Sequence, residues 1–305
     1  MYIKPMIPKK YFWLSIFLLL VAAYFFFQSR RENNYKEGFR QSKPFILKTD
    51  SNAYDNFYAE IYDIINIPEK TASFDYDTII KNTLPDKEYS NFLIVGSGTG
   101  DLVNKLTING YNAHGIDKSQ AMINICASKY PTDDNQCACV ESIASFDKNS
   151  FTHIVCSDYT LYHIKDKHNF FRRCYNWLMP NGYLIVHIVD KDNFTPVKPC
   201  VNKVLDVQFS KDSALKNINR TNVDFGDFTY NVNYNMKDLA NDKMTIKETF
   251  TDKGSKKVRQ NEITLHIEDM KNLLTTARNA GFIQHSLYKL PDDPHQFVVI
   301  LERIG

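Results

Sequence analysis

The chain has 305 residues, enough for one large domain or two small ones. A formal net charge of +2 gives no indication of a nucleic-acid partner, and the basic run at 253–259 contains turn residues without interleaved aromatic side chains. The six cysteines fall mostly inside apolar segments and lack the paired spacing of a zinc site. We therefore expect buried free thiols in a reducing compartment and no bound metal.

The first 30 residues predict a transmembrane anchor. Within them, residues 11–27 contain a single polar side chain, Ser15, and basic pairs stand on both sides. A helix of this length spans roughly 26 Å, the lower limit for crossing a bilayer. The main alternative is a cleaved signal peptide, but the run is long for one and no small-x-small cleavage site follows. We predict a single-pass membrane protein whose domain faces the cytosol.

A polar segment of mixed charge at 31–52 is predicted to be a linker to a domain that covers 53–305. This domain begins with a helical pattern at 53–66, in which Tyr58 and Tyr62 share one face. The aromatic face either packs on the core or lines a pocket, and the two roles are compatible.

From residue 91 onward, apolar strands alternate with helices. The predicted order is strand 91–95, helix 99–109, strand 112–116, helix 119–129, strand 136–140, strand 152–156, helix 166–178 and strand 183–189. This alternation predicts a doubly wound, mostly parallel α/β sheet with helices on both faces and its ligand at the carboxyl ends of the strands. A helix at 268–280 and strands at 282–289 and 296–303 would complete the sheet with an antiparallel edge strand.

Residues 193–266 interrupt the alternation and form a β-rich insertion. Partial period-two spacing at 222–235 indicates a strand, and apolar runs at 244–251 and 258–266 flank a Thr-Asp-Lys-Gly-Ser turn. Two strand patterns around such a turn predict a hairpin.

The most informative segment is the Gly-Ser-Gly-Thr-Gly turn at 96–100, followed by Asp117 at the end of the next strand. Glycines in such a turn let the backbone approach a nucleoside cofactor, and an acid about 20 residues later accepts hydrogen bonds from a ribose. Asp101 stands where a dinucleotide fingerprint has its third glycine. This argues against NAD or FAD and suits a cofactor without phosphates.

With these motifs the chain resembles the class I S-adenosylmethionine (SAM)-dependent methyltransferases, over roughly 53–192 and 262–303. The segments that carry the resemblance, in the family's order, are 93–100, 117–122, 157–164 and 178–185. Two positions depart from the pattern. Ile94 replaces an acid that the family usually has there, and the acid that meets the adenine is displaced from Val140 to Glu141.

The resemblance implies a Rossmann-like fold, SAM as cofactor and a set of site residues. The cofactor-binding residues would be Gly96, Ser97, Gly98, Gly100, Asp117, Lys118, Met122, Glu141 and Ser157. The catalytic candidates are Tyr58, Tyr159 and His163, of which His163 could act as a general base because histidine has a near-neutral pKa. Met122 and His163 also have a purely structural interpretation, as a core residue and as a packing residue.

The leading prediction is a membrane-anchored SAM-dependent methyltransferase that acts on a small-molecule or lipid-like acceptor. The resemblance implies that the 193–266 insertion caps the substrate. The alternative is a non-catalytic SAM-fold binding or scaffold protein, which Ile94 and the displaced Glu141 motivate. A nicotinamide-dependent oxidoreductase is disfavoured by Asp101.

Overall fold

The computed structural model describes residues 41–131, 137–139, 146–196, 204–208 and 218–305, together with Leu19, Val21, Ala22 and Tyr24. Within these residues no helix is both long and apolar enough to cross a membrane. This finding contradicts the predicted single-pass membrane location, which we withdraw. Most of residues 11–27, on which that prediction rested, lie outside the described residues.

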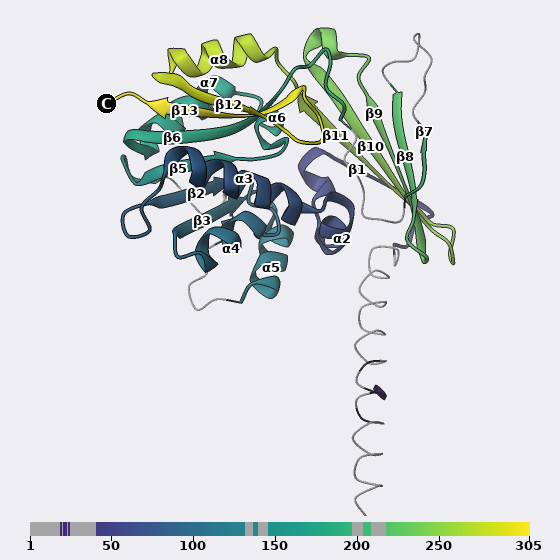
Figure 1. The fold of residues 1–305 in the computed structure, drawn as a ribbon. Helices are drawn as coiled ribbons and strands as arrows, with labels where there is room; N and C mark the ends of the chain where they lie inside the picture. The colour runs from purple at the N-terminus through teal and green to yellow at the C-terminus, as the bar shows by residue number, and fades with distance from the viewer. Residues whose placement is uncertain are drawn as a thin grey trace, which may run out of the picture.

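The described residues form two sheets, of which the first has seven strands and lies on the left in Figure 1. In spatial order the strands are β12 (Phe282–Lys289), β13 (Gln296–Arg303), β6 (Leu178–Val189), β5 (Phe151–Cys156), β2 (Asn91–Val95), β3 (Asn112–Asp117) and β4 (Cys137–Cys139). The five strands from β6 to β4 pair in parallel. The predicted Rossmann-like α/β sheet is therefore confirmed.

The strands at 282–289 and 296–303 complete the sheet at its edge as an antiparallel pair, as predicted, but the strand that runs antiparallel to the rest is β13 and not the edge strand β12. β13 pairs antiparallel with both β6 and β12, so it lies one place in from the edge, and the edge strand β12 runs in the same direction as the parallel strands. The physical reason is burial. β13 is buried along six consecutive residues and needs cover on both faces, whereas β12 exposes half of its residues and tolerates an edge.

Helices cover both faces of this sheet (Figure 1). One face carries α3 (Pro68–Thr83), α4 (Asp101–Ile108) and α5 (Gln120–Lys129), and the other carries α7 (Lys167–Trp177) and α8 (Met270–Asn279). The sequence patterns did not predict α3, because its buried positions include Asp75 and Thr78 and its apolar period is correspondingly weak.

The second sheet has six strands and is built largely from the β-rich insertion. In spatial order the strands are β1 (Phe45–Thr49), β11 (Val258–His266), β10 (Lys243–Asp252), β9 (Phe228–Asn235), β8 (Ile218–Asp224) and β7 (Val204–Gln208). β10 and β11 form the predicted hairpin. β1 pairs in parallel with β11, so the end of the predicted 31–52 linker is part of this sheet.

Helix α2 (Asn56–Asn66) lies between the two sheets (Figure 1). The 3-10 helix η1 (Asp50–Ala53) leads into it from β1, and the Asp55 side chain caps its first turn by accepting from the Tyr58 amide. Phe57 packs edge-on against Phe250 of β10, with ring centroids 5.3 Å apart. The residues between β1 and α3 thus join the insertion to the central sheet.

Candidate functional site

A cavity of about 750 Å³ lies where the carboxyl ends of β2, β3 and β5 face α2 and the second sheet. The sequence-predicted site residues that line it are Tyr58, Gly96, Gly98, Asp117, Lys118, Met122, Tyr159 and His163. Ser97, Gly100 and Ser157 are not among its lining residues, and Glu141 lies outside the part of the chain that the structure describes. Segments from both ends of the domain therefore meet around one space.

The glycine-rich turn is held against β3 by its backbone. The amides of Gly96 and Ser97 both donate to the Ile116 carbonyl, over 2.8 and 3.0 Å. Gly96 has φ +70°, and a Cβ there would lie 2.4 Å from Cγ2 of Thr160. Gly98 has φ +54° and only the Tyr62 ring at 3.8 Å beside it, so its backbone stays open towards the cavity.

Gly100 has a packing role in place of the predicted cofactor contact. A Cβ at Gly100 would lie 2.3 Å from Sγ of Cys126 in α5. In a dinucleotide fingerprint the third glycine allows a helix to pack closely against the turn. Here Gly100, one residue before Asp101, allows this close packing.

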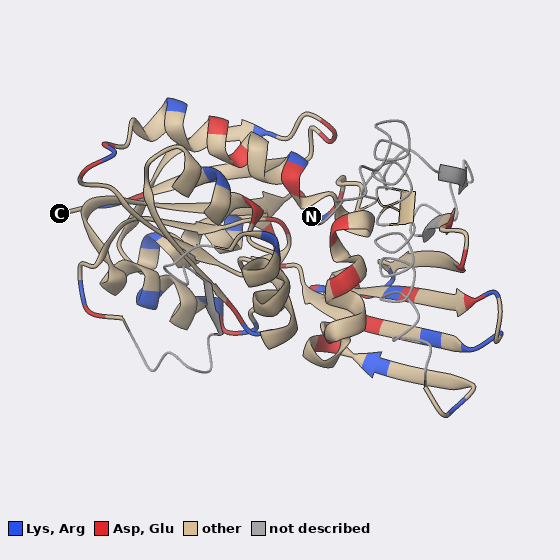
Figure 2. Cartoon of the chain, turned by 90° about the horizontal axis from the view of Figure 1, so that it is seen from below, with Lys and Arg blue, Asp and Glu red and all other residues tan. Residues whose placement is uncertain are grey.

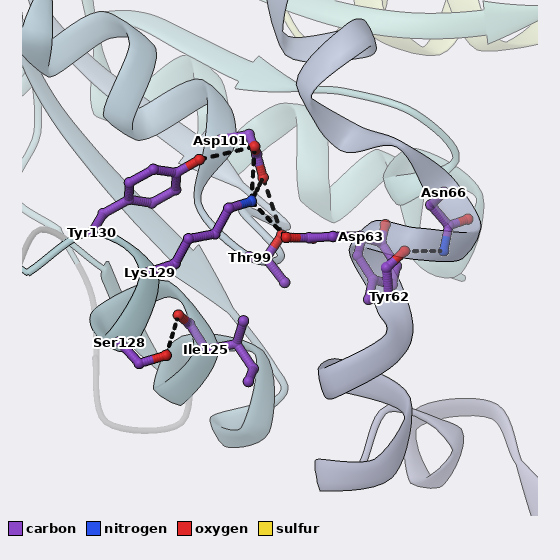
Figure 3. Close-up of polar contacts among 9 residues, drawn as sticks. All are labelled: Tyr62, Asp63, Asn66, Thr99, Asp101, Ile125, Ser128, Lys129 and Tyr130. Atoms are coloured by element: carbon purple, nitrogen blue, oxygen red, sulfur yellow. Dashed lines mark hydrogen bonds and ion pairs between the residues drawn. The ribbon is translucent and has the colours of Figure 1, made fainter. Parts of the chain in front are cut away.

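Asp101 faces away from the cavity and anchors an ion-pair cluster (Figure 3). Its buried carboxylate accepts from Lys129 Nζ at 2.8 and 2.9 Å and from the Tyr130 hydroxyl at 3.0 Å. Lys129 also reaches Oδ2 of Asp63 on α2, at 2.6 Å. The cluster joins the turn, α5 and the helix that covers the cavity.

Asp117 ends β3 at the edge of the cavity. Its Oδ2 accepts from the Gly98 amide at 3.0 Å, and its Oδ1 accepts from the Ser119 amide at 2.8 Å. Burial raises the pKa of this carboxyl, and the backbone amides partly oppose the rise. Because a carboxylate has about four acceptor positions, roughly two remain for a ligand.

Met122 is a core residue that also lines the cavity. The Ser119 hydroxyl accepts from the Met122 amide and donates to the Tyr54 carbonyl over 2.6 Å, which fixes the start of α5 beneath α2. The Met122 side chain, 2% exposed, packs in the main apolar cluster and also lines the cavity.

The predicted site residues in the segment after β5 have different surroundings. The Ser157 hydroxyl donates to Asp75 of α3 over 2.5 Å, so it braces a helix. Tyr159 is buried at the cavity, where burial raises the pKa of its phenol well above the ordinary value. His163, at the end of the short helix α6 (Thr160–His163), lies with Nε2 3.3 Å from the Tyr54 hydroxyl oxygen.

Ile94 packs in the apolar cluster on the α3 and α4 face of the sheet. The residue that departs from the family pattern is therefore a core side chain and is not among the cavity-lining residues.

Glu248 of β10 is a buried cavity residue that the sequence patterns did not identify. Its Oε1 accepts from the hydroxyls of Tyr58 and Tyr230, both at 2.8 Å, and its Oε2 accepts from Nδ2 of Asn261 at 3.1 Å. Burial raises the pKa of this carboxyl despite the three donors. The sequence does contain a sign of this residue, because Glu248 alternates with Ile246 and Phe250 and so lies on the same, inward-facing side of the strand.

Comparison with known proteins agrees with this geometry. Residues 93–186 match a family model described as a methyltransferase domain. Uncharacterized methyltransferases of Bacillus mycoides (strain KBAB4) and Bacillus cereus (strain 03BB102) are each 28% identical over 124 residues. The match covers 39% of this chain and 57% of each relative, so the chain spans little more than half the length of these curated relatives.

Two solved structures show a similar fold. A SAM-dependent methyltransferase from Clostridium acetobutylicum ATCC 824 aligns with a TM-score of 0.58 and 17% identity, over 82% of this chain and 99% of that one. The CcbJ methyltransferase from Streptomyces caelestis aligns with a TM-score of 0.60 and 15% identity, over 83% and 98%. These likenesses extend over most of the chain.

Proposed function

We propose that this chain, whose residues 93–186 form a methyltransferase domain of the class I SAM-dependent family, transfers a methyl group from SAM to a small-molecule acceptor. One observation carries the proposal. The Asp117 carboxylate is fixed at the cavity edge by the amides of Gly98 and Ser119 and retains acceptor positions that two ribose hydroxyls would fill.

The residues around Asp117 fit the rest of the cofactor. Gly98 offers an open backbone for close approach, and Met122 offers buried apolar surface beside the carboxylate. Lys118, which follows Asp117, also lines the cavity. When bound, SAM supplies an electrophilic methyl group on a cationic sulfur.

The charge of the cavity wall suits a cationic ligand. The charged lining residues are five carboxylates and two lysines, namely Asp50, Asp117, Asp158, Asp238, Glu248, Lys118 and Lys243. Helix α2, which covers the cavity, carries acidic residues and neither Lys nor Arg (Figure 2). An excess of carboxylates in a partly enclosed space raises the local concentration of cations.

The remaining task of the protein is to orient the acceptor and exclude water, because methyl transfer from a sulfonium is an in-line displacement. Tyr58 and Tyr62 of α2 line the cavity together with residues of β9, β10 and β11. We propose the second sheet as the substrate cap, and Tyr159 and His163 as residues that contact the acceptor.

Calorimetric titration with SAM and with its demethylated product, S-adenosylhomocysteine, tests the proposal. The full-length parent should bind both. Asp117→Ala should weaken binding about 100-fold, because each hydrogen bond to a charged carboxylate contributes about 1.5 kcal/mol. Asp77→Asn, which removes an exposed carboxylate on α3, is the matched control and should leave binding unchanged.

The outcomes are separable. Absence of binding to either ligand at millimolar concentration would overturn the proposed function. Equal affinity of the parent and Asp117→Ala would overturn the site while leaving the fold intact. A parent that binds both ligands but methylates none of a broad set of small acceptors would favour the non-catalytic binding protein.

A further inference from the structure

Glu248 is hydrogen-bonded entirely by neutral groups. Its three donors are two tyrosine hydroxyls and one asparagine amide, and the described ion pairs include none to this carboxylate. Three of its roughly four acceptor positions are filled, so one remains. A buried carboxylate without a cation is costly, which is the ordinary reason for such groups to be paired.

The nearest cation on the inner face of the sheet is already matched. Arg259 of β11 donates to both oxygens of Asp55, at 3.0 and 2.9 Å, and from Nε to Oδ1 of Asn261 at 3.1 Å. Arg259 thus forms its ion pair with Asp55, which Lys48 also contacts at 3.4 Å, and its charge acts on Glu248 only through space. Glu248 is the carboxylate of this network that has no ion pair of its own among the described residues, and it lies at the cavity wall.

Aromatic rings surround the same position. Tyr58 and Tyr54 pack edge to face with centroids 5.3 Å apart, and both line the cavity together with Tyr230 and Tyr234. The negative faces of such rings attract organic cations and continue to do so when N–H groups are replaced by methyl groups. A carboxylate within a group of tyrosines favours an ammonium group over a neutral hydroxyl.

We propose that the acceptor is an amine, and that Glu248, Tyr58 and Tyr230 form the subsite that holds its nitrogen. This inference rests on the proposed function and names its substrate class. An ammonium donor fills the remaining acceptor position and forms a direct ion pair with Glu248, whereas an alcohol fills the position without one.

The transfer balances with the groups at hand. The ammonium first gives one proton to Glu248, so that the nitrogen has a lone pair. The lone pair forms the new N–C bond to the methyl group while the S–C bond breaks and its electron pair stays on sulfur. The products are a neutral thioether and a methylated ammonium, and the proton on Glu248 leaves to solvent. The raised pKa of Glu248 brings it closer to that of an amine, which favours the first step.

A pair of probes matched in shape tests the charge preference. The affinities of 2-phenylethylamine and 2-phenylethanol are measured by calorimetry on the full-length chain, with and without S-adenosylhomocysteine. The parent should bind the amine at least tenfold more tightly than the alcohol. A parent that binds the two equally, or neither of them, overturns the proposal.

Glu248→Gln should reduce the preference to less than threefold. Because the new amide faces Nδ2 of Asn261 and this variant could fold poorly, the double variant Glu248→Gln/Asn261→Asp is the second reagent. It keeps the number of carboxylates and restores a donor–acceptor pair, but moves the charge to a residue that does not line the cavity. Loss of the preference in the folded double variant supports the proposal, and a preference equal to the parent's overturns it.

Glu262→Gln, on the opposite face of β11, is the matched control and should keep the preference. Binding of S-adenosylhomocysteine is measured in the same samples. If that ligand fails to bind while the amine preference is present, the proposed function fails and the amine subsite stands. If it binds in every variant and the preference is absent, only the amine subsite fails.

Discussion

Lys129→Met should loosen helix α2 from the glycine-rich turn. In the native cluster one ammonium bridges two carboxylates, Asp101 beside the turn and Asp63 on α2 (Figure 3). Methionine keeps much of the aliphatic stem, so the change removes mainly the charge, including the contact of the ammonium with the Tyr130 ring, 5.0 Å from its centroid.

The magnitude follows from burial. The Asp101 side chain is 6% exposed, while Lys129 and Asp63 are 29% and 33% exposed. Removing one partner of a fully buried pair costs about 3–5 kcal/mol, and an exposed pair contributes about 0–1 kcal/mol. Because Tyr130 still donates to Asp101, while the Thr99 hydroxyl makes its shorter hydrogen bond to Asp63, we expect the free energy of unfolding to fall by about 2–3 kcal/mol. Asp63→Asn should cost only about 0.5–1 kcal/mol.

Urea unfolding measures these losses, and calorimetry with S-adenosylhomocysteine measures the effect on the cavity. Helix α2 places Tyr58 and Tyr62 in the cavity wall. Both variants should therefore lower the affinity for S-adenosylhomocysteine about 3- to 10-fold, which corresponds to about 1 kcal/mol of lost interaction between α2 and the turn. Lys70→Met is the control, since its pair with Asp292 is 58% and 55% exposed. The reasoning is wrong if Lys129→Met loses no more stability than Lys70→Met.

Two further predictions concern the sheet around the site. Gly100→Ala should destabilise the chain by at least ~1–2 kcal/mol, the cost of a left-handed conformation at a residue with a side chain, because φ is +88° and the new Cβ would also meet the Cys126 sulfur. In urea unfolding, adding Cys126→Ala to this variant should recover part of the lost stability. No recovery would refute the clash. Burial lowers the pKa of His153 to about 3, so only the unfolded chain takes up this proton and the free energy of unfolding should fall as the pH falls from about 6.5 towards 3. His153→Gln, which can still bond Thr83, should show a shallower fall between pH 7 and pH 5, and an unchanged slope would contradict this assignment.

Local patterns predicted the central sheet well because its strands are buried on both faces and its helices present one apolar face. They did not predict α3, whose buried face includes Asp75 and Thr78. The place of β1 could not be predicted either, because it pairs with β11 more than 200 residues away and nothing in five residues specifies that partner. Neighbour order in a sheet depends on such long-range contacts, and the same limit applies to which of β12 and β13 lies at the sheet edge.

The cofactor half of the cavity could be predicted from local sequence, whereas the acceptor half could not. The turn and Asp117 are close in sequence, and their geometry is set by backbone hydrogen bonds, so a motif can reveal them. The acceptor half is assembled from Tyr58 of α2 and residues of β9, β10 and β11, which have no common motif.

Strand periodicity nevertheless contains information about the acceptor half. In β10 the inward phase runs Met244, Ile246, Glu248 and Phe250, so a carboxylate interrupts an otherwise apolar face. In β11 the inward phase opens with Arg259 and Asn261, and pairing sets Glu248 opposite Asn261. A polar residue at an apolar phase costs stability unless partners satisfy it, and here two neighbouring strands place such residues side by side. At such positions the polarity of the residue conflicts with its buried place in the strand, and conflicts of this kind are typical of binding and catalytic sites. The interrupted periodicity of β10 therefore identifies Glu248 as the first residue to change in the search for the acceptor.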